Sequence, residues 1–303
     1  MTDEGTRVGF PDLVGADLRV RVVAHPAAAE AVEREVLDEV ARLERVLSPL
    51  DPDSEFCRWR CGSGVDPHMS PDLATALAAS ERFWVFSQGA YHPGAEPLIR
   101  RWRQAELDGT PPTQAELKAL ASGLELPYTA VSGPVRRTGD CSRVDLGPVA
   151  RGYVLDRALE AGWRIGLASS IELDAAGVRR QRGRDGVRVV LDLPGAPDAP
   201  GHALRLKDAA LARSSRPADG FRVGECVHRA VLDPRTGWPI DDITEVVALA
   251  PDCMTAGVLA SIAGLGRPTA GFPGCAWLVV HDDGTATRSE DWPLIGGTVT
   301  LPA

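Results

Sequence analysis

A chain of 303 residues, 44% apolar and 25% charged, has the composition of a globular protein that buries a sizeable core. Its net charge of −9 argues against binding to nucleic acid or to an acidic membrane, because both need clustered Lys and Arg. The first twenty residues are acidic where a signal peptide is basic, and no apolar run reaches the roughly 18 residues of a membrane helix. We therefore expect a cytoplasmic protein. The length allows one large domain or two small ones, but no boundary stands out, and we expect a single domain over residues 1–303.

The first third of the chain predicts one strand followed by amphipathic helices. Alternation over residues 17–23 is typical of a strand, and the apolar stripe over residues 27–47 predicts a long helix packed on a sheet. A turn then leads into a short helix ending near Arg60, in which Ser54 and Glu55 either line a pocket or only cap a surface helix. Further helices are expected over residues 72–87 and 113–121.

Residues 144–156, with the sequence VDLGPVARGYVLD, predict a strand, a turn at Gly147-Pro148 and a helix. A helix entered in this way directs its first backbone N–H groups at the turn, which suits an anion such as phosphate. Arg151 in the first turn would add positive charge. The alternative is a turn that only connects two elements, since such turns are common.

The second half of the chain alternates strand patterns with one helix. The apolar run over residues 255–265, rich in Gly and Ala, predicts a closely packed last helix. Strands are expected within residues 165–178 and over residues 187–193, 203–206, 245–249 and 276–280. The six cysteines lack paired C-x-x-C spacing, so we expect free thiols.

Five segments, in the same order, resemble motifs of the ApbE-type flavin transferases, which cut FAD and attach FMN to a Ser or Thr of another protein. Residues 144–156 resemble that family's DLGGIAKGYAVD motif. The other four are SPLDPDSEFCRWR at residues 48–60, GAYHPGAEPL at residues 89–98, HRAVLDPRTGWPI at residues 228–240 and APDCMTAGVLASIAGLG at residues 250–266.

The resemblance implies an α+β fold of ApbE type, T-fold-like, with mixed, largely antiparallel sheets flanked by helices around one flavin-binding cleft. It implies FAD or a related nucleotide as ligand and an acceptor flavoprotein as partner. His228 is the residue expected to take the proton of the reacting hydroxyl, with a structural hydrogen bond in its turn as the alternative. The positions that the resemblance assigns to the cofactor are Ser54, Glu55, Asp145, Gly147, Arg151, Gly152, Tyr153, Asp156, Arg213, Ser214 and Ser215.

The metal positions implied by the resemblance depart from the family pattern. Gly257 stands where the family has an Asp that binds Mg²⁺, and Ser261 stands where it has a Thr. Residues 175–177, Ala-Ala-Gly, replace a Gly-Gly-Asp turn. Ser261 alone is a weak neutral ligand, and loss of the carboxylates removes the main attraction for Mg²⁺. Glu172 or Asp174, just before the altered turn, would be the substitute carboxylate.

Two further departures bring nitrogen side chains to the site. His92 replaces an Asp of the family's F-D-P segment, and Arg213 replaces the Thr of its T-S-G segment. Either residue could neutralise a phosphate without a metal, since an Arg fork binds phosphate oxygens through two hydrogen bonds. The alternative for each is a solvated surface residue. Tyr91 and His92 are expected to be exposed in a loop held extended by Pro93 and Pro97.

These departures leave two other functions beside FMN transfer. One is a noncatalytic FAD carrier or sensor, and the other is an enzyme that acts on a different substrate in the same cleft. The chain lacks the D-x-x-S/T-G-A-T pattern of an acceptor, the nearest segment being DDGTAT at residues 282–287. Modification of the protein by itself is therefore not expected.

Overall fold

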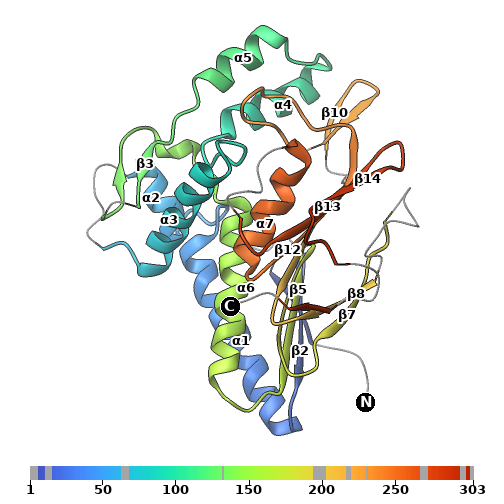
Figure 1. The fold of residues 1–303 in the computed structure, drawn as a ribbon. Helices are drawn as coiled ribbons and strands as arrows, with labels where there is room; N and C mark the ends of the chain where they lie inside the picture. The colour runs from blue at the N-terminus through green and yellow to red at the C-terminus, as the bar shows by residue number, and fades with distance from the viewer. Residues whose placement is uncertain are drawn as a thin grey trace.

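The computed structural model describes residues 6–10, 16–62, 68–131, 133–193, 203–215, 220–229, 231–266, 272–293 and 298–300. A layer of helices covers one face of a long sheet, and smaller elements gather at one end of it (Figure 1). This is the α+β architecture that the family resemblance implies. The helices are α1 (Pro26–Leu47), α2 (Glu55–Cys61), α3 (Pro71–Phe86), α4 (Glu96–Asp108), α5 (Gln114–Ser122), α6 (Gly147–Arg164) and α7 (Cys253–Ile262).

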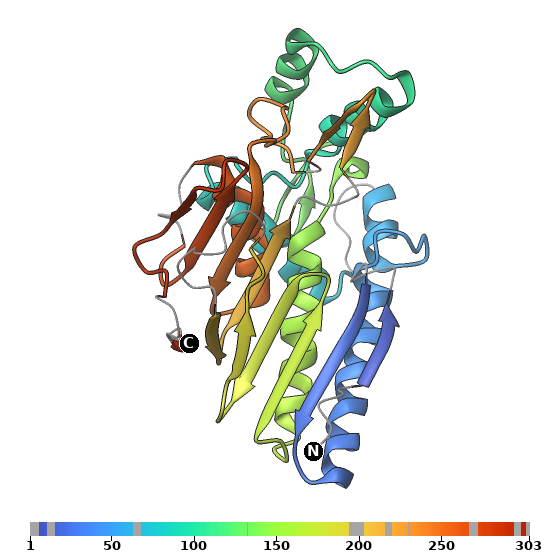
Figure 2. The same cartoon turned by 90° about the vertical axis from the view of Figure 1, so that its right-hand side faces the viewer.

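The main sheet has eight strands in the order β1-β2-β5-β6-β9-β12-β13-β14, and every neighbouring pair is antiparallel. Figure 2 looks onto its face away from the helices. Its strands are β1 (Thr6–Phe10), β2 (Ala16–Val23), β5 (Ser170–Ala175), β6 (Val178–Gly183), β9 (Ala210–Ser215), β12 (Ile243–Ala250), β13 (Ala276–His281) and β14 (Ala286–Arg288).

Three small sheets accompany the main one. A three-stranded sheet has the order β15-β8-β7 and mixes a parallel with an antiparallel pair. Two-stranded sheets join β10 to β11 and β3 to β4. Their strands are β3 (Tyr128–Thr129), β4 (Arg136–Arg137), β7 (Val187–Val190), β8 (Ala203–Lys207), β10 (Phe221–Val223), β11 (Cys226–His228) and β15 (Thr298–Thr300).

Hydrophobic spacing explains the helices that the sequence predicts. The apolar stripe of α1 is fully buried at Val32, Val36, Val40, Leu43 and Leu47, and it packs on α6 and β2. Helix α5 begins with a complete capping box between Thr113 and Glu116. Among the described residues, none of the helices combines the length and apolar character that a bilayer span requires.

Helix α4 is an element that the sequence analysis did not predict. Pro93 and Pro97 predict an extended loop, but Pro97 lies in the first turn of α4, where its missing N–H costs nothing. Gly109, in the left-handed conformation with φ of +66°, ends the helix. Its buried side, with Leu98 and Trp102, builds a core of its own.

The buried side chains form three clusters. The largest lies between the main sheet and helices α1, α3, α6 and α7. A second lies between the central strands of that sheet and strands β7 and β8. The third is small and joins α4, α5 and β10 through Leu98, Trp102, Leu117, Phe221 and Leu232. The candidate catalytic histidine packs against this third cluster.

All six cysteines are free thiols, as predicted. Cys61 and Cys226 are exposed, and the other four are buried: Cys57, Cys141, Cys253 and Cys275. Burial raises the pKa of the Cys141 thiol to about 11, so this group stays protonated at neutral pH.

Candidate functional site

The backbone N–H groups at the start of α6 form hydrogen bonds within the turn itself. Asp145 Oδ1 accepts a hydrogen bond of 2.8 Å from Gly147 N, and the N–H groups of Val149 and Ala150 both donate to the Leu146 carbonyl. Pro148 has no N–H. The prediction of free N–H groups for an anion is therefore wrong, because a side chain and the preceding carbonyl take those that exist. The prediction of a strand before the turn is also wrong, since Val144 to Leu146 lie in no strand.

Arg151 and Asp145 are the charged groups of this turn. The Arg151 guanidinium is largely buried, and burial lowers its pKa while nearby Asp145 opposes that shift. Arg151 Nε is buried and has no hydrogen-bond partner among the described residues. Asp145 is exposed beside it. A ligand at this turn would thus meet a cation with an unused donor and a carboxylate that accepts N–H or O–H groups.

Helices α6 and α7 touch through their backbones at Gly152. A Cβ at Gly152 would lie 2.4 Å from Met254 N, so only glycine permits this contact. One turn later, the Asp156 carboxylate accepts hydrogen bonds from Cys253 N at 2.9 Å and from Met254 N at 3.2 Å. Asp156 therefore caps α7 and also lies 3.4 Å from Arg180 Nε. Burial raises the pKa of Asp156 to about 7.

Tyr153 is held from the other side of α6. Its hydroxyl donates to Asp72 Oδ1 at 2.7 Å, and Asp72 in turn pairs with Arg42 at 2.8 Å. These bonds join α6 to the start of α3 and to α1. Gly152, Tyr153 and Asp156 thus serve the contacts of α6 in this structure, whereas Asp145 and Arg151 face outward or stay unsatisfied.

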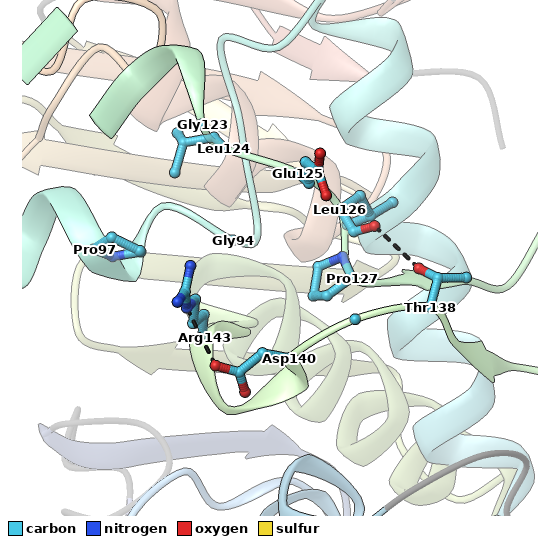
Figure 3. Close-up of a pocket in the computed structure, with 11 residues that line it drawn as sticks. Gly94, Pro97, Gly123, Leu124, Glu125, Leu126, Pro127, Thr138, Asp140 and Arg143 are labelled. Carbon is cyan, nitrogen blue, oxygen red and sulfur yellow. Dashed lines mark hydrogen bonds and ion pairs between the residues drawn. The ribbon is translucent and has the colours of Figure 1, made fainter. Parts of the chain in front are cut away.

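A hollow of about 100 Å³ lies beside this turn (Figure 3). Asp145 N donates to the Pro93 carbonyl at 2.8 Å, which ties the turn to Gly94 at the edge of the hollow. Arg143 Nε and Asp140 Oδ2 face one another at 3.3 Å. The hollow is lined by Gly94, Pro97, Gly123, Leu124, Glu125, Leu126, Pro127, Thr138, Gly139, Asp140 and Arg143.

Tyr91 and His92 turn inward, so the expectation that they are exposed is wrong. The Tyr91 hydroxyl lies 2.7 Å from Ser80 Oγ, and burial raises its pKa well above the usual range. His92 Nδ1 accepts from Gly94 N at 3.0 Å, so the ring proton belongs on Nε2. Burial lowers the pKa of His92 to about 4. A neutral imidazole at physiological pH does not supply positive charge to a phosphate.

The positions implied for Mg²⁺ do not fit that ion. The Cα of Gly257 packs on α6, and a Cβ there would lie 3.3 Å from the Pro148 carbonyl oxygen. Ser261 Oγ donates to the Gly257 carbonyl at 3.0 Å within α7. Among the described residues, no group of three or more His, Cys, Asp or Glu side chains is arranged to hold a metal. One carbonyl and one hydroxyl lack the charge and ligand number that a hard cation needs.

Neither of the two carboxylates expected as substitutes points toward Gly257 and Ser261. Glu172 and Asp174 alternate along β5 with Ile171 and Leu173, which are buried toward the helices, so the two acids point to the opposite face. Both are paired there with Arg179, at 3.4 and 2.6 Å. Residues 175–177 form the tight turn between β5 and β6, with φ of +49° at Ala176 and +78° at Gly177.

His228 ends β11 and is held by two neighbours. Its Nδ1 lies 2.5 Å from Asp241 Oδ2, and its ring packs on Trp102 of α4 with centroids 4.9 Å apart. Because a carboxylate only accepts, the proton of the neutral ring belongs on Nδ1 and the lone pair on Nε2. Trp102 is anchored by a hydrogen bond of 2.8 Å from its Nε1 to the Gly237 carbonyl.

Arg229 connects the His228 pair to β9. Its backbone N donates to Asp241 Oδ1 at 2.9 Å, and its guanidinium donates to the Ser214 carbonyl at 3.0 Å and lies 3.2 Å from Ser214 Oγ. The side chain is fully buried and also donates to the Ile243 carbonyl at 2.6 Å. Ser214 is thereby brought into one network with His228, although 14 residues separate them.

The neighbours of Ser214 are placed differently. Arg213 Nε donates to the buried Glu245 carboxylate at 2.6 Å, and its other arm donates to the Asp192 carbonyl at 2.9 Å. Glu245 thus balances the charge of Arg213, which makes it a poor phosphate ligand as it stands. Ser215 ends β9 and is exposed.

Ser54 and Glu55 act at helix ends. Ser54 is fully buried as the N-cap of α2; its Oγ accepts from Cys57 N at 3.0 Å and donates to the Ser48 carbonyl at 2.7 Å. Glu55 Oε1 accepts from Ser70 N at 2.6 Å at the start of α3. The capping alternative accounts for both contacts.

Most of the predicted residues fall into two groups, and Ser54, Glu55, Arg213 and Ser215 lie in neither. Asp145, Gly147, Arg151, Gly152, Tyr153 and Asp156 lie on or beside α6, together with Gly257 and Ser261 of α7. Ser214 and His228 lie in the network of Arg229 and Asp241. Sequence reasoning missed these last two residues and Trp102. A signal existed for Asp241, since it and His228 flank the D-P-R-T-G turn, whose arms meet at the Leu232–Pro239 bridge.

Comparison with known proteins agrees with the fold. Flavinyl transferase ApbE from Pseudomonas stutzeri, apo form, superposes with a TM-score of 0.74 at 19% identity, covering 95% of this chain and 94% of that one. The ApbE protein from Thermotoga maritima gives 0.77 at 21%, covering 94% and 96%. Flavin transferase ApbE from Vibrio cholerae gives 0.72 at 22%, covering 95% and 98%.

Sequence comparison gives a more specific result. No curated protein sequence gives a significant match. The sequence profile of the ApbE family matches residues 14–273, which is most of the chain. The protein therefore belongs to the ApbE family.

Proposed function

We propose that this protein binds FAD beside the α6 turn and transfers FMN to a Ser or Thr of a partner protein. Family membership supports the ligand and the type of reaction. The observation that carries the proposal is the hydrogen bond of 2.5 Å between His228 and Asp241. It leaves Nε2 of His228 as the basic atom of a half-buried ring.

The reaction assigns a proton to His228. The acceptor hydroxyl oxygen forms a bond to the phosphorus of the FMN half, and the bond from that phosphorus to the bridging oxygen breaks. AMP leaves with the bridging oxygen, and His228 Nε2 takes the hydroxyl proton. Asp241 holds the ring and stabilises the imidazolium that forms. General-base assistance of this kind is worth about a hundredfold or more in rate.

Asp145 and Arg151 would hold the nucleotide. Arg151 offers a buried donor without a partner, suited to a phosphate oxygen. Asp145, exposed next to it, accepts from a sugar hydroxyl or a ring N–H. Gly147 has a positive φ of +30°, a conformation that glycine adopts more readily than other residues. The resident cation of the site is then an arginine, since the residues at the implied metal positions do not fit Mg²⁺.

A noncatalytic FAD carrier is the second candidate. It is favoured by one observation: the backbone N–H groups at the start of α6, which would stabilise charge on a transferred phosphate, are already bonded within the turn. A carrier needs Asp145 and Arg151 but makes no use of His228. The two functions therefore differ in the residue on which they depend.

The test is a titration of the purified protein with FAD, with and without Mg²⁺, that follows flavin fluorescence and AMP release together. A peptide with the D-x-x-S/T-G-A-T pattern serves as acceptor. Transferase activity predicts binding and AMP release, with release lowered about a hundredfold in His228→Ala. Asp241→Asn should also slow release and shift the ring proton of His228 toward Nε2, seen by ¹⁵N NMR.

The neighbouring exposed Asp242 supplies the matched control, and Asp242→Asn should behave as wild type. Binding without AMP release, in the presence of the acceptor peptide, would establish the carrier instead. Release that depends strictly on Mg²⁺ would contradict the assignment of the site's positive charge to Arg151. Absence of FAD binding would contradict both candidates.

A further inference from the structure

The face of the main sheet away from the helices carries a basic hollow that the proposed function does not use. Register places Arg19 opposite Asp174 and Arg21 opposite Glu172 on strands β2 and β5. These residues alternate with Leu18, Val20 and Leu173, which are buried against the helices. The face that carries them is the one toward the viewer in Figure 2.

The hollow forms where the small sheet stops covering the large one. Strands β7 and β8 bury the central strands of the main sheet, and β7 is the edge strand of its sheet. Val187 and Arg188 of β7 form one side of the hollow, and β2, β5 and β6 form the rest. Its volume of about 190 Å³ has room for a small ion with a few waters.

The charges of the hollow do not balance. Four arginines line it, Arg19, Arg21, Arg179 and Arg188, against two carboxylates, Glu172 and Asp174. Both carboxylates already lie in ion pairs: Glu172 with Arg21 at 3.8 Å and with Arg179 at 3.4 Å, and Asp174 with Arg179 at 2.6 Å. The hollow thus carries an excess of two positive charges in a protein whose net charge is −9.

Arg19 and Arg188 provide the unused donors. Neither side chain forms an ion pair or hydrogen bond with another described residue. Asp17 lines an adjoining hollow together with Arg19 and Asp174. Burial outweighs the neighbouring arginines and raises the pKa of Glu172, which indicates that the floor is shielded from bulk water.

We propose that this hollow binds a small doubly charged oxyanion, of the phosphate or dicarboxylate class, between Arg19 and Arg188. Planar guanidinium groups bind such oxygens in pairs, and the pairing of Glu172 and Asp174 with Arg179 and Arg21 weakens the repulsion between these acids and the ligand. The site lies across the sheet from α6 and does not depend on flavin binding.

The test is calorimetric titration with inorganic phosphate and, separately, with succinate, at low ionic strength and with chloride as the competing anion. Arg19→Gln and Arg188→Gln should each weaken binding about tenfold, the loss of one charge-assisted hydrogen bond. Glu172→Gln should strengthen anion binding, since it removes a negative charge from the lining of the hollow. Circular dichroism checks that each variant is folded.

Two control variants distinguish binding in this hollow from binding to arginines elsewhere in the protein. Arg164→Gln removes an exposed arginine at the end of α6, and Arg151→Gln removes the cation of the flavin site; both should keep the binding event. Equal losses in Arg164→Gln and Arg19→Gln would show nonspecific attraction and overturn the proposal. Loss in Arg151→Gln alone would move the anion to the α6 turn. Absence of any binding of either anion would also overturn it.

Discussion

The α6–α7 contact and the surroundings of His228 are held in different ways. At the contact, backbone meets backbone at Gly152 and a carboxylate caps α7. His228 instead rests on side chains, namely Asp241 and Trp102, and on a small core separate from the main one. Changes near α6 are therefore expected to disturb the fold, whereas His228 can be varied with the fold intact.

The largest expected effect is that of Gly152→Ala. The new Cβ would meet backbone atoms of Met254 and Cys253 at 2.4 to 2.6 Å, and neither helix can yield without losing packing elsewhere. We expect a loss of about 3 kcal/mol in the free energy of unfolding, measured in urea. Gly123→Ala is the control, because its Cβ meets the nearest atom only at 3.4 Å. Equal effects in both would contradict the tight contact.

Trp102→Phe should give the next largest loss in the free energy of unfolding. It removes the donor to the Gly237 carbonyl and leaves that buried oxygen unpaired, at a cost of about 2 kcal/mol. Hydrogen exchange should increase in α4, β10 and β11 while α6 and α7 stay protected, since the two regions have separate cores. Trp238→Phe, at a partly exposed ring, is the control. A uniform increase over both regions would mean that the cores unfold together.

Asp156→Asn should change the pH dependence of the free energy of unfolding more than its value at neutral pH. The pKa of Asp156 is raised from 3.8 to about 7 in the folded protein, so the folded state holds its proton more tightly than the unfolded state does. This group therefore stabilises the fold least above pH 7 and most below pH 4, and its contribution falls as pH rises between those values. The stability of wild type minus that of Asp156→Asn should fall across this window. A flat difference would place the carboxylate in solvent.

The helices show how far the sequence alone could go. Apolar spacing and capping residues act within a few residues of each other, so α1, α3, α5 and α6 could be predicted. Helix α4 also carried local signals, Pro97 at its start and Gly109 at its end, but two prolines suggested a loop. Val144 and Leu146 alternate like a strand because both are buried, although the segment between η1 (Cys141–Arg143) and α6 pairs with no strand. Its backbone–backbone hydrogen bonds go to Cys141, to Pro93 and to the first turn of α6.

The candidate site was predictable only in part. Asp145 and Arg151 follow from a local motif. Trp102, on which the His228 ring packs, does not, since it is 126 residues away and reaches the histidine through the packing of α4 on β10. Likewise, Glu172 and Asp174 are seen to face away from α7 only once Ile171 and Leu173 are found in the core under the helices. Tertiary contacts decided each of these placements.

The division of the cysteines gives the protein a built-in set of reporters. Cys226 lies two residues before His228 on β11 and is exposed, whereas four thiols are buried. An alkylating reagent should modify Cys61 and Cys226 in the native state and the rest only after unfolding. The rate of labelling at Cys226 would then report whether a ligand is bound near His228. The rate at which the four buried thiols become labelled would report how fast the core opens, and both rates can be measured on the unmutated chain.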